Sequence, residues 1–448
     1  MKISKWKAII LVIAMLMCVV LGACKSETPA PSAETSSEPA PPAETVSEAA
    51  PPDEKDVILS TEELVNHEIY THIGDNALTG VFPPILSDRT AQYKALPVEQ
   101  KSDVHVGWSS AAMVSAWFAG IQQGAEMYAE QYGYKLTFTD AIAWDVVKQT
   151  ADVENMITMG IDILVIDPVD IQAQSVDVMK AIDAGIPVIG LYPMPDDVPL
   201  ITAVTADYYE VSYQAGLNAA TLFDEPINAV FIPGQTGHPI ADSRTCGFMA
   251  GWVYSKQQMA GTAKPYREDA MLIAYNAFYD LVAKGSVDMP EYGLHVLGMA
   301  NGNFDDVGGQ AAAEDLLTAH PDVQMIFGCN DHQCAGAIKV LEQRGMLQDV
   351  KVVTGCDADM SMLALVRDGK LQSTGYNNPI AITKAVFELI HAMFEEGYDA
   401  NNLPTKTPLY YELFTINNYM NVWEDGTEYG KVFDTTFLTI DEINAGGR

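Results

Sequence analysis

The feature that most limits what this chain can fold into is a repeated alternation of short apolar runs with longer helical stretches, which begins at Val104. Most of the runs are continuously apolar, as expected of parallel strands that helices cover on both faces. The stretches between them have a helical period, and one of them ends at Gly133, a residue type that favours a helix C-terminus. Strands that alternate with helices in this way form parallel βαβ units. The predicted strands are 104–108, 135–139, 161–167, 186–192, 228–233, 295–299, 323–328 and 350–355.

These strands are more than one small sheet normally holds, and residues 55–448 are enough for two domains. The predicted fold class is therefore α/β, with two lobes that are each built on a doubly wound parallel sheet. Ligands of such sheets bind beyond the carboxyl ends of the strands. Polar clusters follow several of the predicted strands at that end, namely "DPVD", "GQTGHP", "CNDHQ" and "CDAD". Several such clusters together predict a ligand site.

The first residues have the pattern of a secretory signal. Lys2, Lys5 and Lys7 precede an apolar run from Ala8 to Ala23, which is shorter than the about 20 residues of a membrane-spanning helix. The string "LGAC", which ends at Cys24, resembles the lipobox of bacterial lipoproteins, where the cysteine receives a lipid and becomes the mature N-terminus. We therefore expect a signal peptide at 1–23 and lipidation of Cys24, with an ordinary signal or an uncleaved anchor as the alternatives.

The segment after this cysteine is dominated by Pro, Ala, Ser, Thr and Glu and has no aromatic residue up to Asp53. Such a composition cannot bury enough apolar surface to offset the entropy lost on ordering. We expect 24–54 to be a disordered tether that holds a folded domain away from the membrane, in an extracytoplasmic environment where disulfides persist. The formal net charge of −35 excludes nucleic acid as a partner, because duplex binding depends on Lys and Arg.

The stretch "FGCNDHQCAGA" raises the question of a metal site. If a helix begins at Asn330 or Asp331, His332 and Cys334 lie about 200° apart around its axis and cannot share one ion. Zinc needs about four ligands, and no second Cys or His pair lies nearby at the usual spacing. A contribution from Cys356 keeps a metal open as the alternative, and a disulfide between Cys329 and Cys356 is also open. We predict no metal and no cofactor, and expect Cys246, Cys329, Cys334 and Cys356 to be small buried side chains.

Catalytic motifs are absent from the sequence. It contains no G-x-S-x-G, no H-E-x-x-H and no P-loop, the patterns that would indicate a serine hydrolase, a zinc protease or a nucleotide hydrolase. The prediction is therefore a binding protein rather than an enzyme, and a secreted metal-dependent enzyme is the disfavoured alternative.

Several motifs in order resemble one family, the extracytoplasmic sugar-binding proteins of ABC importers, of the ribose-binding type. The resemblance covers roughly 104–390 and depends on 145–170, 181–189, 315–345, 352–359 and 368–379. It implies a type I periplasmic binding protein fold, in which two lobes joined by three crossing segments close on a ligand. By this resemblance the crossings lie near Asp207, near Asn377 and after Leu403. The implied division is an N-terminal extension at 55–102, a first lobe from 103–206 with 378–406, and a second lobe from 207–377 with 407–448.

The resemblance also assigns the ligand-binding residues. Trp117 and Phe118 take the place of an aromatic pair that faces the sugar ring, and Phe304 faces its other side. Polar groups for the ring hydroxyls, the remaining predicted contacts, are Arg244, Asn330, Asp357 and Asn377, the last where the family often has Gln. The sequence departs from the family at Ser115, where Asn is expected, and at Tyr192-Pro193, where an Asp-Arg pair is expected. This departure leaves the ligand class better supported than the ligand identity.

This assignment agrees with the chemistry of sugars, which have apolar faces for aromatic rings and a hydroxyl perimeter for charged and amide groups. The sequence thus predicts a monomeric lipoprotein that captures a monosaccharide-like ligand and delivers it to the membrane subunits of an ABC importer. A sensor that presents a sugar, nucleoside or furanone signal to a membrane receptor is the alternative.

Three segments have no counterpart in typical members of the family: 54–102, an expansion at 252–292, and the tail after Pro408. The expansion contains a predicted helix from Arg267 to the capping residue Gly285, with aromatic residues spaced for one core face. Those aromatic residues are Tyr275, Phe278 and Tyr279.

Overall fold

The computed structural model describes residues 68–69, 78, 94–142, 144–191, 194, 198–263, 267–358, 360–403, 406–409 and 413–417. The predicted signal peptide, Cys24, the tether and Tyr192-Pro193 lie outside these residues. Within them, no helix has both the length and the apolar composition that crossing a membrane requires.

The first sheet contains six strands in the order β12-β5-β4-β3-β1-β2. All of its pairings are parallel. Its strands are β1 (His105–Ser110), β2 (Lys135–Asp140), β3 (Ile163–Ile166), β4 (Val188–Leu191), β5 (Ala203–Ala206) and β12 (Lys406–Leu409). The helices that cover it are α4 (Ala116–Tyr132), α5 (Val146–Met159), α6 (Ile171–Asp183) and α13 (Pro379–Phe394).

Alternate residues of β3 explain why its run is continuously apolar. Ile163 and Val165 pack in one cluster with side chains of α4 and α13. Leu164 and Ile166 belong to another cluster, formed with side chains of α5 and α6. Both faces of the strand are therefore buried, as the sequence pattern predicts for a parallel sheet with helices on both sides.

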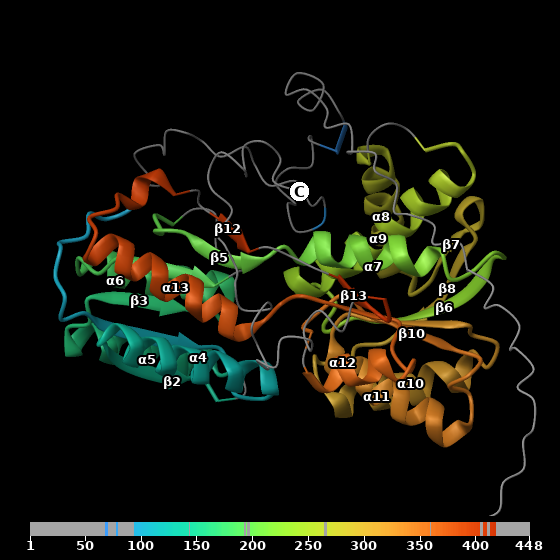
Figure 1. The fold of residues 1–448 in the computed structure, drawn as a ribbon, viewed down its shortest axis with the longest axis horizontal. Coiled ribbons are helices and arrows are strands. Elements are labelled where there is room, and N and C mark those ends of the chain that lie inside the picture. The colour runs from blue at the N-terminus through green and yellow to red at the C-terminus, as the bar shows by residue number, and fades with distance from the viewer. Residues whose placement is uncertain are drawn as a thin grey trace, which may run out of the picture. The chain divides into compact units, whose positions relative to one another are not determined.

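The second sheet contains five strands in the order β10-β9-β6-β8-β7, parallel except for the edge strand β7. In Figure 1, α7 and α8 lie on one face of this sheet and α10 and α11 on the other. Its strands are β6 (Ile227–Ile232), β7 (Val287–Met289), β8 (Leu294–Met299), β9 (Met325–Gly328) and β10 (Lys351–Val353). Its helices are α7 (Tyr208–Ala220), α8 (Pro239–Met259), α9 (Glu268–Lys284), α10 (Asp306–Ala319), α11 (Asp331–Arg344) and α12 (Met360–Arg367).

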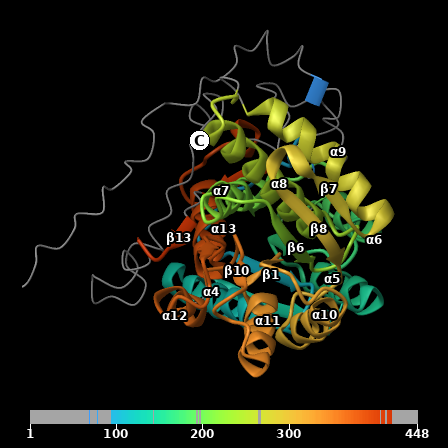
Figure 2. The ribbon, with the colours of Figure 1, turned by 90° about the vertical axis from the view of Figure 1, so that its right-hand side faces the viewer.

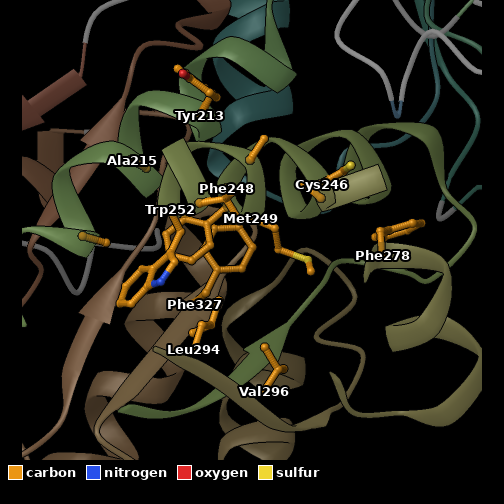
Figure 3. Packing of buried hydrophobic residues seen from close by; sticks show 14 of the residues in the cluster. Tyr213, Ala215, Cys246, Phe248, Met249, Trp252, Phe278, Leu294, Val296 and Phe327 are labelled. Atoms are coloured by element: carbon orange, nitrogen blue, oxygen red, sulfur yellow. The ribbon is translucent and has the colours of Figure 1, made fainter. Parts of the chain in front are cut away.

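Aromatic rings fill the space between this sheet and α8. The rings of Phe248 and Phe327 stack with their centroids 4.3 Å apart, and Phe231 meets Phe327 edge-on at 5.2 Å. Figure 3 shows Phe248 of α8 against Phe327 of β9, with Trp252 beside them. The Trp252 indole Nε1 donates to the Tyr292 carbonyl O at 2.8 Å. The second lobe is thus built on a large aromatic core.

Close approach of α7 to α8 depends on the absence of a side chain. A Cβ at Gly251 would lie 1.9 Å from the Tyr213 carbonyl O, and one at Gly216 would lie 2.1 Å from the Phe248 carbonyl O. Glycine is therefore required at both helix positions, because any other residue would force the two backbones apart.

The expansion forms α9, which lies beside α8 in both views (Figures 1 and 2). Arg267 is its N-cap residue and Gly285 ends it with a φ of 73°, so the predicted helix is confirmed. Tyr275 and Phe278 are buried, whereas Tyr279 is 47 % exposed. The prediction of one buried face is wrong for Tyr279, whose ring meets those of Tyr275 and Phe278 edge-on.

Every predicted strand overlaps an observed one, and the strands that the sequence did not predict have three or four residues. The predicted lobe boundary after residue 406 is wrong, because it cuts β12, which pairs with β5 along Lys406–Leu409 in the first sheet. The remaining elements are β11 (Ser373–Gly375), which pairs antiparallel with β13 (Leu413–Thr415), and the 3-10 helices η3 (Pro290–Tyr292) and η4 (Ala400–Asn402).

Candidate functional site

Arg244 is the centre of a polar cluster in the second lobe. It lies on α8 and is 3 % exposed. Its Nη1 donates to the Cys329 carbonyl O at 3.1 Å, and its Nη2 lies 3.5 Å from Asp357 Oδ1. The guanidinium also lies over the ring of Tyr208, 4.8 Å from its centroid. Its Nε is buried and has no hydrogen-bond partner among the described residues, so one donor of a buried cation is left unused.

Asp357 follows β10, beyond its carboxyl end. Its φ is 132°, a backbone conformation that residues other than glycine rarely adopt and that costs on the order of 1–3 kcal/mol. The conformation is held by its N–H, which donates to the Gly375 carbonyl O at 3.0 Å. Its Oδ1 accepts from Asn377 Nδ2 at 2.9 Å. Such strain is typical of functional sites, because the surrounding structure must maintain it.

Asn377 connects this cluster to α4 of the first lobe. Its backbone carbonyl O accepts from the indole Nε1 of Trp117 at 2.9 Å. Its side chain is 3 % exposed, and its Oδ1 has no hydrogen-bond partner among the described residues. A buried acceptor without a partner therefore lies on the same side chain that donates to Asp357.

The side-chain amide of Asn330 makes two hydrogen bonds within the protein, one of them as a helix cap. Its Oδ1 accepts from the Gln333 N–H at 3.1 Å at the start of α11, and its Nδ2 donates to the Phe304 carbonyl O at 3.1 Å. Asparagine is a preferred residue at this position. The contact fixes the backbone of Phe304, whose φ is 59°.

The ring of Phe304 occupies space that a side chain at residue 234 would fill. A Cβ at Gly234 would lie 2.1 Å from ring atoms of Phe304. The ring also meets His238 edge-on, with centroids 5.2 Å apart. Burial, together with the nearby Arg244, lowers the pKa of His238 to about 4, so its imidazole is neutral at physiological pH. Phe304 thus has a fixed position beside an uncharged imidazole.

The predicted aromatic pair lies at the start of α4. The rings of Trp117 and Phe118 meet at 90° with centroids 5.1 Å apart, and Trp144 meets Phe118 edge-on at 5.5 Å. Ser115 is the N-cap residue of α4, and its side chain makes no capping hydrogen bond. The pair is therefore packed as one aromatic group with a third ring that the sequence did not predict.

Tyr208, Trp144 and Asp167 are the residues of this region that sequence reasoning missed. Tyr208 directly follows the predicted first crossing, and Asp167 begins the "DPVD" cluster, so each had a signal in the sequence. Trp144 had none, because its place depends on a loop in which its own φ is 67°. Burial raises the pKa of the Asp167 carboxyl to about 7.

The cysteines are four buried free thiols in the described part of the chain: Cys246, Cys329, Cys334 and Cys356. Burial raises the pKa of Cys329 to about 11, so this thiol is protonated. His332 Nδ1 contacts Asp306 Oδ1 at 3.2 Å, whereas Cys334 packs in the core with its Sγ toward the Val353 carbonyl O. No group of three or more His, Cys, Asp or Glu suited to a metal ion occurs among the described residues.

Comparison with known proteins identifies the family to which this fold and cluster belong. The family model described as periplasmic binding protein domain matches residues 106–397. The chain belongs to this family of periplasmic binding proteins. The family consists of solute-binding proteins that act outside the cytoplasm and are not enzymes.

Curated relatives of this periplasmic binding protein indicate its type. It is 25% identical over 295 residues to the ribose import binding protein RbsB of Bacillus subtilis (strain 168). This match covers 65% of this chain and 83% of the relative. It is 28% identical over 258 residues to the ribose import binding protein RbsB of Escherichia coli (strain K12), covering 58% and 74%. The chain is therefore a type I periplasmic binding protein of the ribose-binding type.

A solved structure supports the same fold. A protein from Mycobacterium smegmatis, in complex with β-D-fucofuranose, superposes with a TM-score of 0.59 at 21% identity. The match covers 75% of this chain and 99% of that chain.

Proposed function

We propose that this periplasmic binding protein captures a monosaccharide-like ligand between its two lobes and delivers it to an ABC importer. The observation that carries the proposal is two buried polar atoms beside Asp357 that have no hydrogen-bond partner among the described residues, the Arg244 Nε and the Asn377 Oδ1. One is a donor and the other an acceptor, as the hydroxyl groups of a sugar require. A buried polar atom without a partner costs about 1–3 kcal/mol, which a ligand hydroxyl would offset.

The aromatic side chains fit the same ligand. Trp117 and Phe118 on α4 offer apolar surface for one face of a sugar ring, and Phe304 offers it for the other. Charged and amide groups at Arg244 and Asp357 then meet the hydroxyl perimeter. The names of the relatives, which are ribose import binding proteins, support a ligand the size of a monosaccharide.

The mechanism we propose is closure of the lobes. The first lobe contains β1 to β5, β12, α4 and α13, and the second contains the sheet of β6 to β10. A ligand that contacts both lobes shifts the population toward the closed form only through its preference for that form. The closed form with ligand would then be the one that the membrane subunits of the importer recognise.

A ligand screen tests this function. Thermal unfolding of the protein with D-ribose, other pentoses, hexoses, polyols and nucleosides is expected to give a higher melting temperature with at least one sugar or polyol. Ligand at a hundredfold over its dissociation constant should add about 2.7 kcal/mol to the unfolding free energy. Small-angle X-ray scattering at saturation should give a smaller radius of gyration. An unchanged radius with a bound sugar would argue against closure, and no response to any sugar or polyol would remove the proposed ligand class.

We further propose that the protein is anchored through a lipid on Cys24, on the evidence of the "LGAC" string before a polar segment. Cys24→Ala is expected to move the protein from the membrane fraction to the soluble fraction, because the variant has no cysteine at this position to receive the lipid. Fractionation and immunoblotting measure this. Cys18→Ala, which replaces a cysteine inside the apolar run that precedes Cys24, is the matched control and should stay with the membrane. Full membrane retention of the Cys24 variant would instead indicate an uncleaved anchor.

A further inference from the structure

Asp167 is a buried carboxylate that the proposed sugar site does not use. It directly follows β3 and is 9 % exposed. Its N–H donates to the Ser109 carbonyl O at 2.9 Å, and its own carbonyl O accepts from Gln149 Nε2 at 2.7 Å. These bonds continue the sheet by one residue. Asp167 therefore lies on the same face of the sheet as Ile163 and Val165, which is the face that α4 covers.

The carboxyl group borders the predicted aromatic pair. The backbone N–H of Ala111 favours its charged form and opposes the rise in its pKa. Ala111 belongs to one apolar cluster with Phe118, against which Trp117, Trp144 and Val169 pack. Asp167 is thus held at the carboxyl end of β3 beside the rings proposed to face the ligand.

No described cation pairs with this carboxylate. Within the part of the chain that the structure describes, Asp167 takes part in no ion pair, in contrast to Asp357, which has Arg244 at 3.5 Å. Burial raises the pKa of Asp167 to about 7, and the backbone N–H of Ala111 opposes the shift. A buried carboxylate without a positive partner is unfavourable, so a cation brought by a ligand would be stabilised here.

Tyr208 connects Asp167 to the polar cluster of the second lobe. Its ring lies under the guanidinium of Arg244. Burial raises the pKa of the Tyr208 hydroxyl, and its electrostatic neighbours include Arg244, Asp167 and Asp357. One buried hydroxyl is therefore close to both carboxylates and to Arg244. Arg244 pairs with Asp357, whereas Asp167 has no ion-pair partner among the described residues, which leaves one negative charge for the ligand to balance.

We propose that the ligand is an amino-substituted sugar or polyol whose ammonium group pairs with Asp167. This inference rests on the proposed function and specifies the ligand of the same site. An ammonium group has three donors and a positive charge, whereas a hydroxyl group in its place could donate only one hydrogen bond. The hydrogen bonds of charged partners are roughly twice as strong as neutral ones.

Isothermal titration calorimetry on the full chain tests the proposal with matched probes. D-glucosamine is compared with D-glucose, D-galactosamine with D-galactose, and an amino-deoxy inositol with myo-inositol. At least one amine should bind about tenfold or more tightly than its hydroxyl counterpart. Asp167→Asn should raise the dissociation constant of that amine by about 10- to 100-fold and change that of the hydroxyl counterpart by less than about threefold.

The control variant is Asp170→Asn, in the same loop. Asp170 caps α6 by accepting from the Ala173 N–H at 2.7 Å, and asparagine caps equally well, so amine binding should not change. Unliganded Asp167→Asn should melt at the same or a higher temperature, since it removes a buried charge. Asp167→Ser is the second variant and should lose the amine preference as well.

Each outcome decides the proposal. If no amine binds better than its counterpart, or if the amine preference survives in both Asp167 variants, the proposal is overturned. Neutral sugars that bind and compact the protein would then leave the proposed sugar-binding function standing. Absence of binding by amines and neutral probes alike would remove both.

Discussion

Arg244→Ala is expected to weaken binding of the tightest sugar or polyol from the screen by about 1.5–3 kcal/mol, which is about ten- to more than a hundredfold in the dissociation constant. The reason is that the guanidinium is buried and keeps one unused donor, the Nε, while its other contacts orient it toward Asp357. The variant removes that donor and leaves Asp357 without its cation. Isothermal titration calorimetry on the variant and the parent measures the effect.

Asp357→Ala removes the partner carboxylate and should weaken the same ligand by a similar factor, because Asp357 orients both Arg244 and Asn377. Arg344→Ala is the matched control. Arg344 is an exposed arginine at the C-terminal end of α11 that donates to the Glu314 carbonyl O, and its loss should leave affinity unchanged. Parental affinity in both Arg244→Ala and Asp357→Ala would place the binding site elsewhere in the protein.

The sequence was sufficient to predict the strands with a continuously apolar run, because burial on both faces imposes a pattern that is visible without any tertiary information. The strands it did not reveal are short or lie at an edge. The β7 strand has three residues, including Asp288, and β12 contains Pro408, a residue that usually argues against a strand. Pairing with β5 and β8, rather than local preference, makes these segments strands.

For the site, too, the sequence predicted individual residues from local motifs but not the contacts between distant residues. Arg244, Asp357 and Asn377 were predicted from separate motifs, and the structure brings them together. The motif around Asn330 did not reveal that both ends of its amide are used within the protein. The sequence places Tyr208 directly after the predicted first crossing but does not reveal its contact with the guanidinium that packs over its ring. Contacts of this kind join residues far apart in the chain.

Arg267→Met is expected to destabilise the folded protein by about 3–5 kcal/mol. Arg267 stands at the start of α9 in the expansion, and its Nη1 donates to Glu210 of α7, with both side chains buried. Its guanidinium also lies over the ring of Tyr213, 4.8 Å from the centroid. The loss of the arginine leaves a buried carboxylate beside Asp207, whose pKa is already raised to about 7 by burial and by Glu210. Equilibrium urea denaturation measures the change.

The double variant Arg267→Met with Glu210→Met separates the charge from the packing. A buried ion pair that is replaced by apolar side chains of similar volume is often neutral or stabilising, so the double variant should recover most of the lost stability. A double-mutant cycle then gives the coupling energy of the pair. Lys284→Met, at the exposed end of the same helix α9, is the control and should change stability by less than about 0.5 kcal/mol. If the unfolding free energy of Arg267→Met lies within about 1 kcal/mol of the parent's, the ion pair is not what fixes the expansion to α7. The expansion would then be attached by its apolar contacts alone, through buried side chains such as Phe278.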